Sequence, residues 1–522
     1  MADRAQPLSA GLRLGAGAAV LLTLALTLGP LGAVLARAGT FAALGPADWA
    51  ALRFTVAQAT VSAALSLGLA VPVARALARR RFPGRGLLIT LLGAPFILPV
   101  IVAVMGLLAI FGRSGLVNDG LAALGIGRIS IYGFGGVVLA HVFFNLPLAV
   151  RLLLQGWLAI PAERFRLAAS LGFGPGDIAR HLERPMLKAL GPGIFVTIFL
   201  ICLTSFAVAL TLGGGPRATT VELAIYQAFR FDFDLGRAAH LASLQLALCA
   251  ATALVAARFT VPSAFGAGLD RPVARWDAGG AGLRVLDTLL LGAAALFLLA
   301  PLAAVFLTGL PRLATLPEPV WRAALRSVLV ACGSTAVAMG VSLPLALAIA
   351  RRGRAGMLEV VGMLPLATSS LVTGTGLFLL LRPLASPGDL ALPVTVAVNA
   401  AMALPFVLRA LIPAARDLEA DYGRLAQSLG MRGLSRLWLL TLPRLRRPLG
   451  FSAGLTAALS MGDLGVIALF ADEDHTTLPL QLYRLMGAYR MADAAGAAVL
   501  LLGLSFGLFW MFDRGGRADA GA

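Results

Sequence analysis

The stretch TLLLGAAALFLLAPLAAVFLTGLP, residues 288–311, decides the class of fold because its 24 residues include no charged side chain. A helix needs roughly 20 apolar residues to cross a hydrocarbon core about 30 Å thick. Backbone polar groups find no water in lipid, so a crossing segment of this kind must be helical. Residues 288–311 are therefore predicted to form a membrane-spanning helix.

Eleven further stretches of this kind are spread along the 522 residues, which are 59% hydrophobic and only 13% charged. Ten of these stretches lack Asp, Glu, Lys and Arg, and the remaining one contains Asp463 as its single charge. They are residues 14–36, 54–74, 86–112, 129–150, 189–216, 238–257, 327–350, 360–381, 390–408, 448–471 and 494–512. The sequence predicts an all-α polytopic membrane protein of about 12 transmembrane helices, in contact with membrane lipid.

The net charge of +18 is a signal of membrane orientation. When the connections are placed alternately on two sides, 30 of the 43 Lys and Arg residues fall on one side. That side comprises residues 1–13, 75–85, 151–188, 258–284, 351–354, 409–447 and 514–522. Positive residues favour the cytoplasm, so both termini are predicted to be cytoplasmic, in a bacterial inner membrane. This distribution explains the basic charge without nucleic acid as a partner.

The first apolar stretch, residues 14–36, could also belong to a cleaved signal peptide, since Arg4 and Arg13 precede it. Its 23 residues are long for the apolar region of a signal peptide, which favours an uncleaved first span.

The chain contains an internal repeat. Residues of the first half recur in the second at displacements of 272, then 258, then 257 positions. The drop of 14, from 272 to 258, falls in one external connection, which is longer in the first half (residues 113–128) than in the second (residues 382–389). The matching sets are Gly68, Pro72, Arg79 and Arg80 with Gly340, Pro344, Arg351 and Arg352; Leu146, Pro147, Arg151, Gly172 and Pro185 with Leu404, Pro405, Arg409, Gly430 and Pro443; and Thr219, Thr220 and Tyr226 with Thr476, Thr477 and Tyr483. We expect two parallel six-helix repeats, residues 1–257 and 285–522, joined by a cytoplasmic linker at 258–284, with the substrate path between them.

The fourth connection of each repeat is long and patterned alike. The first reads Arg166-Leu-Ala-Ala-Ser-Leu-Gly172 and the second Arg424-Leu-Ala-Gln-Ser-Leu-Gly430, and a proline follows each glycine after 13 positions. Each pattern predicts a short helix with an apolar face, ended by a glycine in the left-handed conformation, and then a second short helix. The proline is expected to mark re-entry into the bilayer. A protruding structure that occurs twice indicates a twofold partner, although helices lying on the membrane surface are the alternative.

These two connections resemble the EAA loop of ABC importer permeases, whose pattern is Glu-Ala-Ala, three residues, Gly, nine residues, Ile-x-Leu-Pro. The matching residues are Ala168, Gly172, Leu182 and Pro185, then Ala426, Gly430, Leu440, Leu442 and Pro443. The departures are Arg166 and Arg424 in place of Glu, Leu167 and Leu425 in place of the first Ala, and Arg184 in place of the Leu before proline. The resemblance implies a fold like that of type I ABC importers and an ATPase-coupling role for both connections.

External segments carry a narrower resemblance, to the thiamine and thiamine pyrophosphate permeases. They are residues 204–220 with Tyr226 and residues 230–237, then residues 462–470 with 476–479, Tyr483 and 489–493. The resemblance implies two copies of an ABC ATPase subunit and a periplasmic thiamine-binding protein as partners. Iron(III) permeases share the layout and remain the alternative substrate class.

The sequence gives no sign of an enzyme site or of a cofactor bound by this chain. It lacks a Gly-x-x-x-x-Gly-Lys-Ser/Thr loop, so we expect ATP to be used by the partner ATPase. Cys202, Cys249 and Cys332 lie singly within spans, which predicts neither a disulfide nor a metal site.

Polar residues within the spans have two possible roles. Asp463 is expected to face the protein interior, where capping a helix is favoured over contact with a cationic substrate. His141, Asn145 and Asn399 are expected to bond neighbouring helices. An ion-coupled secondary transporter, a different class, also fits the span count, but such proteins usually carry more ionisable groups at the membrane centre.

Overall fold

The computed structural model describes residues 9–38, 44–93, 95, 97–213, 215, 218–259, 279–351, 356–472 and 474–517, and the regular structure within them is helical. The first predicted repeat contains α1 (Ala10–Ala38), α2 (Pro46–Arg79), α3 (Arg85–Leu91), α4 (Val100–Phe111), α5 (Leu116–Ala123), α6 (Phe134–Leu158), α7 (Ala162–Ser170), α8 (Pro175–Ile178), η2 (Ala179–Glu183), α9 (Arg184–Leu203), α10 (Phe206–Leu212), α11 (Val221–Arg230) and α12 (Leu235–Ala256). The predicted linker at 258–284 lies largely outside the described residues, which stop at 259 and resume at 279.

The second predicted repeat follows a similar order, but among the described residues it has no counterpart of α5, has one helix in place of α6 and α7, and adds a 3-10 segment after its first helix. It contains α13 (Ala281–Gly309), η5 (Leu310–Thr315), α14 (Glu318–Arg351), α15 (Gly356–Met363), η6 (Leu364–Ala367), α16 (Ser370–Leu381), α17 (Pro387–Ser428), α18 (Gly433–Arg436), η7 (Leu437–Thr441), α19 (Leu442–Met461), α20 (Gly465–Phe470), α21 (Leu478–Gly487) and α22 (Met491–Arg517). The described residues form 11 helices long and apolar enough to cross a membrane, or 12 when one sharply bent pair is counted as a span. This agrees with the predicted number.

Four predicted spans are interrupted helices, which corrects the prediction of continuous ones. Residues 86–112 form α3 and α4, and residues 360–381 form two helical pieces that meet at 92°. Residues 189–216 and 448–471 are likewise divided, into α9 and α10 and into α19 and α20. Pro99 and Ser369 stand immediately before α4 and α16, both with extended ψ angles, so neither can continue a preceding helix.

The first helix of each predicted repeat packs on the other repeat. Helix α1 lies against α14 and α16, whereas α13 lies against α2 and α4. Two glycines permit this reciprocal packing. A Cβ on Gly376 would collide with the Pro30 carbonyl of α1, and one on Gly106 would collide with the Pro301 carbonyl of α13. Only a glycine, which has no Cβ, allows the backbones of the two facing helices to approach so closely.

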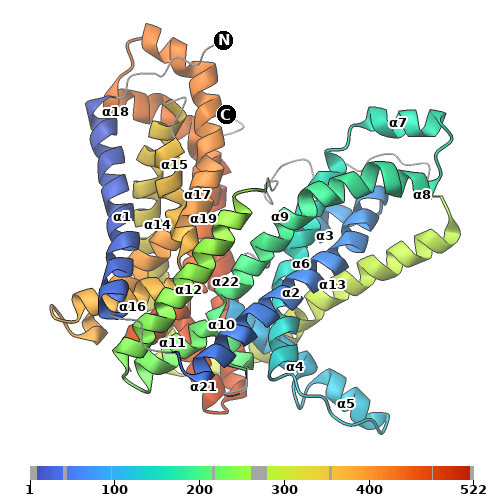
Figure 1. The fold of residues 1–522 in the computed structure, drawn as a ribbon, viewed down its shortest axis with the longest axis horizontal. Helices are drawn as coiled ribbons and strands as arrows, with labels where there is room; N and C mark the ends of the chain where they lie inside the picture. Colours follow the sequence, from blue (N-terminus) through green and yellow to red (C-terminus); the bar gives the residue numbers. More distant parts are fainter. Residues whose placement is uncertain are drawn as a thin grey trace.

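The two lobes of the molecule diverge toward one end and converge toward the other (Figure 1). The diverging end carries α7 and α8 on one lobe, α18 on the other, and both chain termini. Helices α5, α11, α16 and α21 lie toward the converging end. The two predicted EAA-like connections therefore lie at the same end of the molecule, on separate lobes.

The drop of 14 in the repeat displacement corresponds to a real structural difference. Helix α5 occupies the longer connection of the first repeat, and its Asn118 fastens it by donating to the Gly112 and Ile129 carbonyls at 2.8 and 2.9 Å. The Ile129 N–H donates back to Asn118 at 2.9 Å. At the equivalent place the second repeat passes from α16 to α17 within five residues.

Candidate functional site

We name residues 162–185 elbow one and residues 420–443 elbow two. In each elbow a helix ends at a glycine with positive φ, +70° at Gly172 and +64° at Gly430. The next N–H donates back to the carbonyl of Ala168 at 3.0 Å in elbow one and of Ala426 at 2.9 Å in elbow two. This closing pattern satisfies carbonyls at the helix end and requires a left-handed residue, so the predicted conformation of both glycines is confirmed.

Each elbow buries one face and exposes an apolar edge. Ala168 and Ala426 are 3% and 1% exposed. Leu167 and Leu171 of elbow one and the matching Leu425 and Leu429 of elbow two are between 53% and 66% exposed. Two leucines one turn apart, repeated on separate lobes, form a pair of equivalent apolar surfaces that suit insertion into a groove.

The remaining predicted coupling residues lie near these edges. Arg166 is exposed and pairs with Glu163 at 3.1 Å, a surface ion pair, and Arg424 is also exposed. We call the helical segment before the glycine of each elbow its first arm and the segment after the glycine its second arm. Leu182 and Leu440 are half-buried within the second arms.

The prolines of the two elbows stand at the start of long apolar helices and do not break the helical chain. Pro185 and Pro443 lie in the first turns of α9 and α19, directly after the five-residue π-helical segments η2 and η7. Proline lacks an N–H and its ring crowds the carbonyl four residues earlier, and a wider turn relieves both problems. After its glycine, each elbow therefore continues as one uninterrupted helical segment, through α8, η2 and α9 in elbow one and through α18, η7 and α19 in elbow two.

The first arms of the two elbows differ, which the sequence pattern did not reveal. In elbow one, Pro161 separates α6 from α7, whereas α17 continues for 42 residues through the equivalent position, which is Glu419. Glu419 accepts from Arg351 of α14 at 2.7 Å and from Arg436 of α18 at 2.6 Å, and all three side chains are at most 10% exposed. A buried ionic cluster thus fastens elbow two to the membrane helices.

Elbow one has its own buried anchor at a different position. Glu183 of η2 pairs with Arg75 of α2 at 2.8 Å and accepts from the indole N–H of Trp157 of α6 at 3.2 Å. The two anchors use non-equivalent residues but have the same effect. Each ties the second arm of its elbow to long helices of the same repeat, which are α2 and α6 for elbow one and α14 and α17 for elbow two.

Asp463 lies in the interruption between α19 and α20 and not within a continuous span. Its Oδ1 accepts from the Gly465 N–H at 3.3 Å, and its Oδ2 is buried without a hydrogen-bond partner. The first contact is the capping role favoured from the sequence. The second oxygen, Oδ2, has no partner, so contact of Asp463 with a substrate stays a prediction.

A second carboxylate with a buried oxygen that has no hydrogen-bond partner was missed because it lies outside the predicted spans. Glu222, in the first turn of α11, is 1% exposed, and its Oε1 has no hydrogen-bond partner. The available sequence signal was its place two residues after the matched pair Thr219 and Thr220, where the second repeat has Pro479.

The polar residues expected to bond neighbouring helices do so, and His141 Nδ1 lies 3.4 Å from the Ser62 hydroxyl of α2. Asn399 donates to Ser460 of α19 at 3.0 Å, and Ser460 donates to Ser334 of α14 at 3.1 Å. Asn145 donates to the His141 carbonyl in its own helix at 2.9 Å, and to the Cys202 sulfur of α9 at 3.4 Å.

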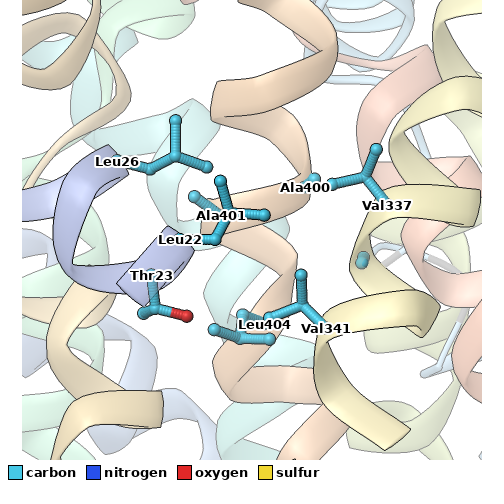
Figure 2. Close-up of a pocket in the computed structure, with 9 residues that line it drawn as sticks. Leu22, Thr23, Leu26, Val337, Val341, Ala400, Ala401 and Leu404 are labelled. Atoms are coloured by element: carbon cyan, nitrogen blue, oxygen red, sulfur yellow. The ribbon is translucent and has the colours of Figure 1, made fainter. Parts of the chain in front are cut away.

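One pocket lies between α1, α14 and α17 and is lined almost entirely by apolar side chains (Figure 2). Thr23 contributes a hydroxyl to its lining, but that hydroxyl already donates to the Ala19 carbonyl at 2.7 Å. The other lining side chains are aliphatic, among them Leu26, Val337 and Leu404. This pocket offers no group to recognise a polar ligand.

The helical membrane fold, its two lobes and its paired elbows define a permease subunit of the ABC importer class. No family model matches the chain. The thiamine transport system permease proteins ThiP of Escherichia coli strain K12 and Salmonella typhimurium strain LT2 are each 42% identical to it, over 482 and 483 residues, covering 89% of this chain and 89% of each relative. That of Brucella abortus strain 2308 is 41% identical over 476 residues, or 89% of this chain and 87% of the relative.

The chain therefore belongs to the family of thiamine transport system permease proteins. This membership confirms both resemblances found in the sequence, the general one to ABC importer permeases and the narrower one to thiamine permeases. It also establishes that the chain is a multi-pass membrane protein and a transport subunit, not an enzyme.

Proposed function

We propose that this chain forms the membrane passage of an ATP-driven importer for thiamine and thiamine pyrophosphate. The named activity of relatives that match 89% of the chain supports the substrate. The single structural observation that carries the mechanism is the pair of equivalent elbows at one end of two diverging lobes (Figure 1). The division into repeats 1–257 and 285–522 with a linker at 258–284 is part of this proposal.

Two copies of an ABC ATPase subunit would each receive one elbow. The exposed leucines supply apolar contact area, and the left-handed glycines fix the angle between the two arms. ATP binding and hydrolysis occur in the partner, and closure of the ATPase pair draws the elbows together. Because each elbow is tied to its lobe by a buried ionic anchor, this movement is transmitted as rigid-body rocking of the lobes.

A periplasmic thiamine-binding protein would deliver the ligand at the converging end, opposite the elbows. The elbows and both termini share the other end, in accord with the positive charge assigned to the cytoplasm (Figure 1). We therefore place both termini in the cytoplasm and the protein in the bacterial inner membrane. The coupling residues, in this proposal, are Arg166, Ala168, Gly172, Leu182 and Pro185 with Arg424, Ala426, Gly430, Leu440 and Pro443, and Asp463 lies on the substrate path.

Labelling of single cysteines tests this placement. Leu171→Cys and Leu429→Cys, each in a Cys332→Ser background because Cys202 and Cys249 are buried, should react with a membrane-impermeant maleimide only from the cytoplasmic side. Addition of the ATPase should protect both cysteines. Leu116→Cys, on the exposed side of α5, is the matched control and should react only from the periplasmic side. Labelling of the elbow cysteines from the periplasm would refute the proposed orientation.

A further inference from the structure

A buried acidic group without an ion-pair partner among the described residues lies beside the bend that precedes α16. Glu222 contacts Ser369, the residue that caps α16 at the 92° bend of the second repeat. Asp463 lies close to the same bend, since a Cβ on Gly465 would meet both Ser370 Oγ at 2.9 Å and Asp463 Oδ1 at 3.6 Å. The helices that carry these residues, α11, α16 and α20, pack against one another. Carboxylates from both predicted repeats therefore lie close to one helix bend.

Among the described residues, no ion pair involves Glu222 or Asp463, and each has one buried oxygen without a hydrogen-bond partner. A carboxylate in the first turn of a helix is favoured by the helix dipole, but an exposed one would serve equally well. Burial of an unpaired acid within a membrane protein is costly, and such residues commonly mark a pathway for a ligand or ion.

The surroundings of Glu222 add further acceptors. The side-chain amides of Gln58 and Gln245 donate to the Cys202 and Leu203 carbonyls at 3.0 and 2.9 Å, at the free end of α9. These bonds occupy their Nε2 atoms and leave both Oε1 atoms buried without a partner. Gln245 also contacts Glu222 directly. A lining that is rich in acceptors and poor in donors suits a cation or a donor-rich ligand.

The fold itself does not require this lining. Both repeats fasten the first turn of the corresponding helix alike, through Val221 N–H to Thr55 and Leu478 N–H to Ser327, at 2.9 and 2.7 Å. In the second repeat, however, the positions equivalent to the acceptors of the first repeat hold apolar residues. Those residues are Val330 for Gln58, Pro479 for Glu222 and Leu502 for Gln245. The second repeat builds the same elements without any of the three polar side chains.

We propose that Glu222, with Asp463 close to the same bend, recognises the positive charge of the ligand as it passes between the lobes. The ligand class is an organic cation with hydrogen-bond donors, which the thiazolium and aminopyrimidine rings of thiamine satisfy. The inference rests on the proposed function and deepens it, because it assigns substrate selection to the permease as well as to the binding protein. Glu222 is thus a specificity-determining residue.

Uptake by the complete complex, reconstituted in proteoliposomes with the ATPase and the binding protein, tests this assignment. Glu222→Gln keeps the size and shape of the side chain but removes the charge and replaces one acceptor oxygen by an NH2 donor, whereas Glu222→Asp keeps the charge on a shorter side chain. We expect thiamine uptake to fall at least tenfold in Glu222→Gln and to be partly retained in Glu222→Asp. ATP hydrolysis stimulated by the loaded binding protein should change less than twofold, because the elbows are untouched.

A purely structural role predicts the opposite order, with Glu222→Gln close to wild type and Glu222→Asp impaired, and that order would overturn the proposal. An uncharged thiamine isostere with a thiophene ring should cross Glu222→Gln as well as it crosses wild type. Asp493→Asn, which removes the half-buried carboxylate that pairs with Arg490 near the converging end, is the matched control and should transport thiamine normally.

Gln245→Leu carries the test if the Glu222 variants fail to assemble, since leucine is the residue at the equivalent position of the second repeat. Its thiamine uptake should fall severalfold, and unchanged uptake would refute the acceptor lining. Absence of thiamine uptake by the wild-type complex would instead refute the proposed function.

Discussion

The substitution Glu419→Gln is the sharpest test of how elbow two is held. Glu419 accepts from both Arg351 and Arg436, and all three side chains are at most 10% exposed. Glutamine keeps the size of the side chain but leaves two arginines side by side without their shared counter-charge. Removing one partner from a buried ion pair typically costs about 3–5 kcal/mol. We expect the free energy of unfolding to fall by about this amount.

Unfolding titrations in mixed detergent micelles measure the effect. Glu359→Gln is the matched control, because Glu359 pairs with Arg416 at 3.3 Å on the surface, where such pairs contribute less than about 1 kcal/mol. The double variant Glu419→Gln/Arg351→Gln should recover part of the lost stability, since it removes one of the two repelling charges. In the assembled complex, Glu419→Gln should also lower the ratio of thiamine transported to ATP hydrolysed. A loss of stability no larger than that of Glu359→Gln would refute the anchoring role.

Three further substitutions test the packing and the elbows. Gly376→Ala should lower the free energy of unfolding by about 1–3 kcal/mol, because its Cβ collides with a backbone carbonyl of α1, whereas Gly68→Ala, with open space around it, should not destabilise. Equal unfolding midpoints for the two variants would contradict the reciprocal packing of first helices. Gly430→Asp should insert normally but lose at least tenfold in transport and in co-purification with the ATPase, while the exposed Gly120→Asp on α5 should transport normally; normal transport by Gly430→Asp would count against docking at this elbow. Asp287→Asn should destabilise by about 3–5 kcal/mol in the same titrations, since it leaves Arg79 and Arg80, at the C-terminal end of α2, without their shared counter-charge; an unchanged midpoint would show that these ion pairs contribute no stability.

The sequence predicted the span count, the elbows and the extra external connection because each depends on local pattern. An uninterrupted apolar run can only be helical in lipid, and a glycine at a fixed place after Leu-Ala-x-Ser-Leu ends a helix in the same way twice. The insertion that contains α5 was predictable for the same reason, since a change in displacement locates it directly.

The interrupted helices were not predictable from hydropathy, because the residues around Pro99 and Ser369 are as apolar as the spans that flank them. Only the backbone angles show that the chain turns there. The exchange of first helices also escaped prediction, since an apolar stretch carries no information about its neighbour. Gly376 and Pro30 reveal it only when their contact is seen.

The buried charges were missed for a third reason. Glu419 and its partner Arg351 are 68 residues apart, and Glu222 follows two threonines in what resembles an external loop. Charge in a loop predicts exposure, and tertiary packing reversed that expectation at both sites.

The central claim is that the chain transports thiamine only when a separate ATPase binds its two elbows and moves them during ATP hydrolysis. Proteoliposomes that contain the chain, the ATPase and the loaded binding protein should accumulate labelled thiamine with ATP, and should accumulate none when ATP or the ATPase is omitted. Uptake by the chain alone, driven by an ion gradient in the absence of nucleotide, would contradict the account.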